Sequence, residues 1–263
     1  MARNDKRGEL PTLPQEWGLV QEGLQVAVRM AQIAEQAVRD LLPAVMHMRQ
    51  LSDPRLSPTL TQRQSDVFRF LQTQFRLPAN PDYQDVANVA DAFQRIHRRL
   101  ASLNRNMFRM VTAAVANAES NREGGDTFGY VDPSQPNVIF LNEMYFSLGS
   151  GRAMHTPAPP PRSVQRQPPR LGSSTPPRGV VTSPLDEMHI LHPTPFRAGV
   201  ILHEAVHLAY GADGAVHRAV RGGTAVREGG GSDAFPEIRS YMQAIGDAYV
   251  YERFAKAVYA LRQ

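Results

Sequence analysis

The stretch Val200-Ile201-Leu202-His203-Glu204-Ala205-Val206-His207-Leu208-Ala209-Tyr210 decides the fold, because it places the pattern H-E-x-x-H in an apolar setting. Residues four apart on a helix lie on one face, so the imidazoles of His203 and His207 can reach a single metal ion. Glu204 follows the first histidine, where it can act as a general base without being a ligand. Such a pattern also occurs by chance on amphipathic helices, but the apolar neighbours argue against a solvated face. We therefore predict the active-site helix of a zinc peptidase.

The composition limits both the ligands and the class of protein. A chain of 263 residues, 42% of them hydrophobic, is long enough to bury a sizeable core. It contains no cysteine, so disulfides and thiolate ligands are excluded and Zn²⁺ must be held by His, Asp or Glu. No window approaches the ~20 apolar residues that cross a bilayer, and no apolar signal core follows the N-terminus. We expect no membrane span, and a cytoplasmic location or export by a non-Sec route.

The positive charge is concentrated in one segment. Residues 151–178 carry five arginines and no acidic residue, whereas the whole chain has a net charge of only +4. The remainder is therefore close to neutral, and we do not expect a nucleic-acid partner. The surrounding stretch, about 150–184, is rich in proline and is expected to be a disordered insertion that could bind a protein partner.

The first half of the chain is expected to be helical. We expect residues 1–16 to be a flexible lead-in. Residues 17–120 are expected to form a helical region that packs on the catalytic domain or is part of it. Apolar spacing predicts helices over 17–51, with a kink or division at Pro43, and from about Thr59.

A third helix is predicted from Asp82 to about Ala118. It carries His97, which has no partner at ligand spacing and is expected to be an ordinary helix residue.

The second half, 121–263, is expected to be the catalytic core. Thr127–Val131 and Asn137–Leu141 predict two strands joined by a turn, and Pro236 to about Leu261 predicts a closing helix. The hairpin is expected to lie beside the H-E-x-x-H helix, where it could pair with an extended substrate or serve only as core. The fold class is therefore α+β and mostly helical, with a small sheet or hairpin.

A catalytic zinc site usually has a third protein ligand. Asp213 is the favoured candidate, because Gly211 can end the helix with a positive φ and let the chain turn back toward the metal. Other acidic or imidazole side chains further along the chain remain open as alternatives: Glu237, His217, Asp233 and Asp247.

Three segments together resemble the Asp-zincin group of zinc endopeptidases, the deuterolysin and peptidyl-Lys metallopeptidase relatives. They are Pro136–Phe146, similar to the strand and following segment before the family's zinc helix; Leu202–Leu208, with H-E-x-x-H; and Ile245–Phe254, similar to the family's closing helix. In its lack of cysteines, the chain resembles a bacterial-type relative and not the secreted fungal members.

This resemblance implies a zincin-like fold and endopeptidase activity, with His203 and His207 as metal ligands, Glu204 as catalytic base and an aspartate as third ligand. Zinc would polarise the scissile carbonyl and activate water, and Glu204 would move the proton to the leaving amine. A tyrosine, Tyr210, Tyr249 or Tyr251, could stabilise the oxyanion. The alternative is a catalytically silent zincin-fold binding or effector protein that acts through the proline- and arginine-rich insertion.

Overall fold

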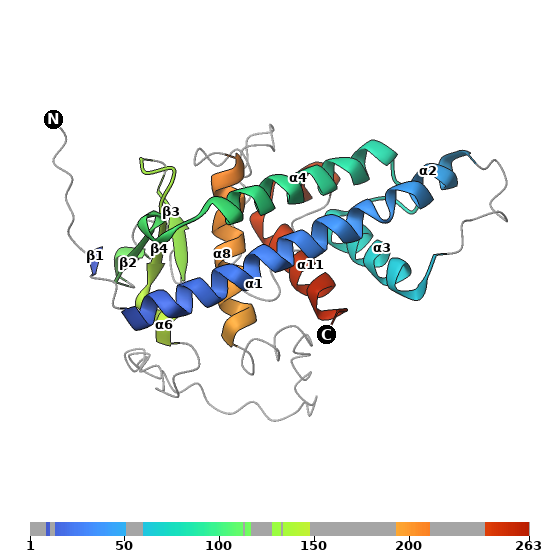
Figure 1. The fold of residues 1–263 in the computed structure, drawn as a ribbon. Helices are drawn as coiled ribbons and strands as arrows, with labels where there is room; N and C mark the ends of the chain where they lie inside the picture. Colours follow the sequence, from blue (N-terminus) through green and yellow to red (C-terminus); the bar gives the residue numbers. More distant parts are fainter. Residues whose placement is uncertain are drawn as a thin grey trace, which may run out of the picture.

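The computed structural model describes residues 9–10, 14–50, 60–112, 114–116, 128–132, 134–147, 193–210 and 240–262. These residues form a mostly helical α+β structure with a small sheet (Figure 1). The helices are α1 (Pro14–Arg39), α2 (Leu42–Gln50), α3 (Gln62–Phe75), α4 (Tyr83–Ser102), α6 (Glu143–Ser147), α8 (Pro193–Tyr210), α10 (Tyr241–Ala244) and α11 (Ala248–Ala260), with a 3₁₀ turn, η2 (Arg105–Met107). The strands are β1 (Glu9–Leu10), β2 (Phe108–Val111), β3 (Gly129–Val131) and β4 (Ile139–Asn142).

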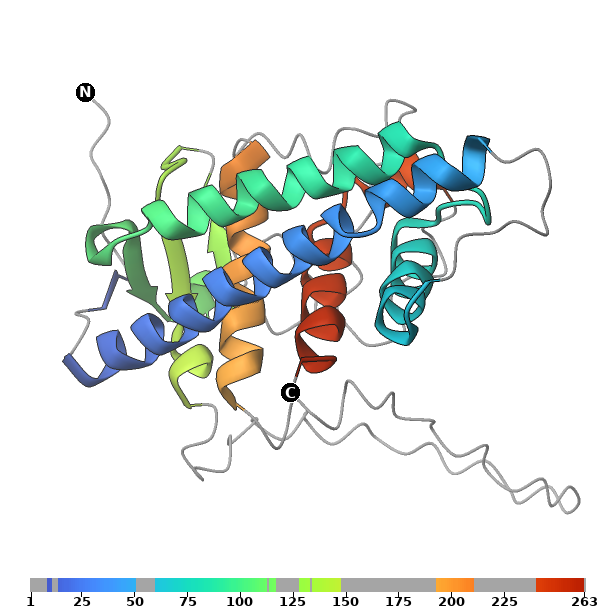
Figure 2. The same cartoon turned by 45° about the vertical axis from the view of Figure 1, so that its right-hand side comes forward.

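Helix α8, which carries the H-E-x-x-H pattern, is the central helix of the structure. It stands between the sheet and α11, while α1 and α4 run side by side across it (Figures 1 and 2). Nearly every side chain from Arg197 to Val206 is buried. A helix that is apolar around its whole circumference must be covered on all sides, and α1, α4, α11 and the sheet provide that cover.

The sheet has the strand order β1-β2-β4-β3. Strand β4 pairs with β2 in parallel and with β3 antiparallel, and all four of its residues are buried. The register of β3 and β4 places Tyr130 opposite Phe140, and their rings stack with centroids 4.8 Å apart. The predicted hairpin of two short strands is therefore confirmed, and β3 is its outer strand within the described residues.

The predicted helix from Asp82 to about Ala118 is wrong in its second half. Helix α4 ends at Ser102, because Leu103 adopts an extended backbone conformation and Asn104 begins the 3₁₀ turn, its side chain accepting a hydrogen bond from the backbone of Asn106. Phe108–Val111 then forms β2, which pairs with both β1 and β4. Strand pairing with distant residues outweighs the helical apolar spacing here.

The prediction that Pro43 divides the first helical run is confirmed. Helix α1 ends at Arg39, and Pro43 lies in the first turn of α2, where a missing backbone donor is tolerated. The closing helix is also divided, since Asp247 caps α11 by accepting a hydrogen bond from Tyr249 N at 2.8 Å. Both breaks follow from local chemistry that the sequence displays.

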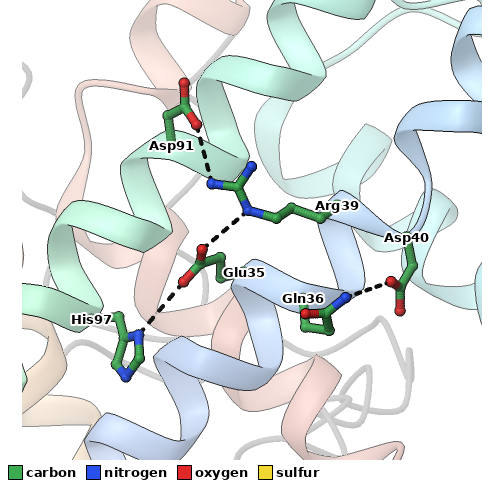
Figure 3. Close-up of polar contacts among 6 residues, drawn as sticks. All are labelled: Glu35, Gln36, Arg39, Asp40, Asp91 and His97. Atoms are coloured by element: carbon green, nitrogen blue, oxygen red, sulfur yellow. Dashed lines mark hydrogen bonds and ion pairs between the residues drawn. The ribbon is translucent and has the colours of Figure 1, made fainter.

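A row of polar contacts joins α1 to α4 (Figure 3). Glu35 on α1 lies 3.1 Å from Arg39 Nε and 3.5 Å from His97 Nδ1, and Arg39 reaches Asp91 on α4 at 3.3 Å. His97, expected to be an ordinary helix residue, is thus half of a carboxylate–histidine contact between two helices. These pairs lie at the partly exposed edge of the two helices, where an ion pair contributes about 0–1 kcal/mol, so they align the helices more than they stabilise them.

Beneath this row, the apolar side chains of α1, α3, α4, α8 and α11 form one continuous core. Four aromatic side chains from α3, α4 and α11 make edge contacts in it: Phe75, Phe93, Tyr251 and Phe254. None of the described helices is both long and apolar enough to cross a membrane. The predicted proline- and arginine-rich insertion, the predicted lead-in up to residue 8 and residues 211–239 lie outside the described residues.

Helix α1 crosses α8 at Gly23, where a Cβ atom would lie 2.7 Å from the Tyr145 hydroxyl and 3.3 Å from Ile201 Cδ1. Gly18, on the same helix, has no atom within 4 Å of such a position. Gly23→Ala should therefore lower the free energy of unfolding by about 1–3 kcal/mol through overpacking. Gly18→Ala, its matched control, should raise it by about 0.5–1 kcal/mol through helix propensity. Urea titrations measure both, and equal effects would contradict the close crossing.

Candidate metal centre

The two histidines of α8 face each other. Their Nε2 atoms are 3.2 Å apart, and the ring centroids are separated by 5.0 Å. His203 is 5% exposed and His207 is half-buried, so the second ring lies on the side of the pair from which a ligand could enter. The expected meeting of two imidazoles one helical turn apart is thus present in the structure.

This separation fits a shared tetrahedral cation. With Zn–N bonds of about 2.0–2.1 Å and a tetrahedral angle, two ligating nitrogens lie about 3.3–3.4 Å apart. The observed 3.2 Å differs little from that value, so small side-chain rotations would be enough. The same distance also suits an N–H···N hydrogen bond between the two rings, which is how a metal-free pair can satisfy its nitrogens. The separation of the two nitrogens is therefore compatible with two corners of a zinc tetrahedron.

The other nitrogen of His203 points to a carboxylate on α11. His203 Nδ1 lies 3.4 Å from Glu252 Oε2, and the second oxygen of Glu252 accepts a hydrogen bond from Lys256 Nζ. These side chains are only 7%, 12% and 8% exposed, respectively. A carboxylate behind a ligating histidine is a recurrent arrangement at metal sites, because it fixes the ring orientation and the tautomer.

Opposing effects act on the Glu252 carboxyl. Burial by itself raises its pKa, but the Lys256 ammonium and the contact with His203 outweigh burial and hold the pKa well below its usual range. Glu252 is therefore ionised at neutral pH, and as a carboxylate it can only accept hydrogen bonds.

Glu204, the predicted base, occupies a different face of α8. It continues the stripe of Phe196 and Val200, which are spaced four residues apart and contact the hairpin: Phe196 lies against Phe128 with ring centroids 4.9 Å apart, and a Cβ on Gly129 would be 3.3 Å from Val200. Glu204 is 5% exposed. Helical spacing therefore puts Glu204 on the stripe that begins at Phe196 and Val200, next to the stripe of the two histidines.

The three candidate tyrosines have different surroundings. Tyr251 is 1% exposed and its hydroxyl donates to Ile245 O at 3.1 Å, so it belongs to the core. Burial raises the pKa of Tyr210, which is also hydrogen-bonded with Tyr251. Of the three, Tyr249 lies against the two histidines, with its ring centroid 4.3 Å from that of His203. Tyr249 is therefore the best placed to act at this site.

The third ligand is not among the described residues. No three His, Asp or Glu side chains in the part of the chain that the structure describes are grouped so that they could hold a metal ion. Asp213, the favoured candidate, and the alternatives His217, Asp233 and Glu237 all fall in 211–239, outside those residues. Asp247 is described, and it caps α11 instead of joining the two histidines.

Sequence reasoning missed Glu252 and Lys256. Their signal was an acidic and a basic residue four apart on a helix that is otherwise mostly apolar, a spacing that allows an ion pair along one face. On a solvated helix such a pair has little meaning, but here it faces α8. Only the packing of α11 against α8 shows that the pair ends at His203.

Comparisons of this chain with protein-family models, with curated proteins and with solved structures found no match.

Zinc should stabilise the protein through the histidine pair. At a free zinc concentration 100 times the Kd, the expected gain is about 2.7 kcal/mol, measured as a rise in Tm over the chelator-treated protein. His203→Ala and His207→Ala should each abolish the rise relative to their own metal-free Tm, whereas His97→Ala should retain it. An undiminished rise in His203→Ala would place the metal elsewhere.

Proposed function

We propose that this protein is a zinc-dependent peptidase of zincin type, in which His203 and His207 hold the metal and Glu204 is the general base. The observation that carries the proposal is the pair of Nε2 atoms 3.2 Å apart on a buried helix, with a carboxylate behind one ring and a glutamate directly following it in sequence. Asp213 is proposed as the third ligand, on the sequence argument alone.

Bound by these residues, zinc would supply Lewis acidity toward a carbonyl oxygen and would lower the pKa of a water ligand. Glu204 takes the proton from the attacking water and passes it to the leaving amine. Its burial supports this role, because a base shielded from bulk water passes its proton on within the site. Two neighbouring stripes of one helix thereby supply the proposed metal ligands and the proposed base.

The proposed substrate is an extended peptide that lies along β3. Among the described residues this strand pairs on one side only, with β4, and it packs against the Phe196–Val200 stripe that leads to Glu204. An added strand would gain backbone hydrogen bonds from β3 and would pass the glutamate face of α8. This arrangement favours an extended peptide over a smaller substrate.

Tyr249 is the proposed stabiliser of the oxyanion. Its backbone is fixed by the Asp247 cap at the start of α11, and its ring packs on His203. A phenol donor held beside a metal ligand can stabilise negative charge that develops on the scissile carbonyl oxygen.

Glu204→Gln tests the base directly. We expect casein cleavage to fall by about 10²–10⁴ in kcat, the usual contribution of a general base, while zinc affinity stays within a few-fold of wild type. Glu35→Gln, a partly buried glutamate on α1, is the control and should retain full activity. Sub-stoichiometric zinc in the wild type, together with unchanged cleavage by Glu204→Gln, would refute the proposal.

Tyr249→Phe separates oxyanion stabilisation from folding. Loss of one donor should lower kcat about 10²-fold with little change in KM, since the donor acts mainly in the transition state. Tyr210→Phe is the comparison, and its kcat should stay close to that of wild type. A larger loss in Tyr210→Phe than in Tyr249→Phe would reverse the assignment of the two hydroxyls.

A further inference from the structure

A line of three polar side chains crosses the interface between α8 and α11. His203 Nδ1 lies 3.4 Å from Glu252 Oε2, and Glu252 Oε1 accepts a hydrogen bond from Lys256 Nζ. The Lys256 ammonium also lies 5.5 Å from the ring centroid of Phe196, back on α8. Each oxygen of the carboxylate thus has its own partner, and the line starts and ends on α8.

Helix α8 leaves space for this line at Gly199. A Cβ atom at this position would collide with the end of the Lys256 side chain and would lie 2.6 Å from Glu252 Oε1. Glycine is unfavourable in a helix interior, so its presence one turn before His203 needs a reason. The close approach of the Glu252–Lys256 pair supplies that reason and shows that the pair is built into the interface.

Burying a lysine and a glutamate side by side is a poor way to gain stability, because apolar side chains of similar volume commonly serve as well or better. The pair therefore needs a further role, and Oε2 of Glu252, the oxygen that Lys256 does not bond, indicates one. This oxygen faces Nδ1 of His203, the ring nitrogen remote from His207. Glu252 therefore acts on an imidazole that would hold the metal.

We propose that Glu252, anchored by Lys256, is a positioning residue for His203: it accepts the Nδ1 proton and so keeps the Nε2 lone pair directed at the space shared with His207. The inference rests on the proposed function in that the shared space is taken to hold zinc. The tautomer that it assigns to His203 is a property of the metal-free protein and can be measured without any metal.

The test uses the full chain with Glu252→Gln combined with Lys256→Met, which removes both buried charges at nearly constant volume and so avoids leaving either one unpaired. Circular dichroism and thermal melting establish that the double variant folds. Glu35→Gln is the matched control, because Glu35 makes the same kind of contact with a histidine, 3.5 Å from His97 Nδ1, away from the site (Figure 3).

The first readout is the tautomer of His203 in the metal-free proteins, from long-range ¹H–¹⁵N correlation spectra. Wild type and Glu35→Gln should show the Nδ1–H form, and the double variant should show a mixture or the Nε2–H form, since a glutamine amide can donate as well as accept. An Nε2–H form in the wild type, or an unchanged Nδ1–H form in the double variant, would overturn the proposal.

The second readout is the affinity for Zn²⁺ alone, from competition with a chelator. Loss of an outer carboxylate should weaken binding about 10–100-fold in the double variant and leave Glu35→Gln unchanged. Affinity within twofold of wild type in the double variant would overturn the positioning role while the proposed peptidase stands. A wild type that binds no zinc would contradict the peptidase, and the tautomer would still decide whether Glu252 orients His203.

Discussion

The burial of α8 on every side is the constraint on which the rest of the structure depends. A helix enclosed by the sheet, α1, α4 and α11 cannot carry polar side chains unless each has a defined partner or a defined task. Arg197 meets this demand by donating to the backbone carbonyls of Tyr145 and Phe146 at the end of α6. His203 meets it through Glu252, so the same packing that stabilises the fold also fixes this contact between α8 and α11.

Two stripes of side chains on α8 face different neighbouring elements. Gly199, His203 and His207 are spaced four apart and follow α11, which provides the carboxylate and the tyrosine ring. The Phe196–Val200 stripe, continued by Glu204, follows β3. An α-helix has 3.6 residues per turn, so side chains spaced four apart form a stripe, and neighbouring stripes stay adjacent along the helix. The proposed metal ligands and the proposed base thus lie on neighbouring stripes of one helix, each stripe facing a different element.

The features that depend on local geometry could be predicted from the sequence. The pairing of His203 with His207 follows from their spacing on any helix, and the β3–β4 hairpin follows from two β-rich runs around a turn. The helix predicted through residue 118 failed, because Leu103, Met107 and Val111 suit a helix face and the decisive pairing of β2 with β4 is not local. Glu252 was missed for the same reason, since its partner lies on another helix.

The arrangement behind His203 is best understood as preorganisation. A neutral imidazole can carry its proton on either nitrogen, and only one form leaves a lone pair for a cation held jointly with His207. If that choice were made only when the metal binds, the binding free energy would be reduced by the cost of ordering the ring. Tertiary packing of α11 on α8 holds Glu252, Lys256 and the space at Gly199 in place. A pair of buried charges that would be a weak source of stability thereby has a physical reason to be present at this one interface.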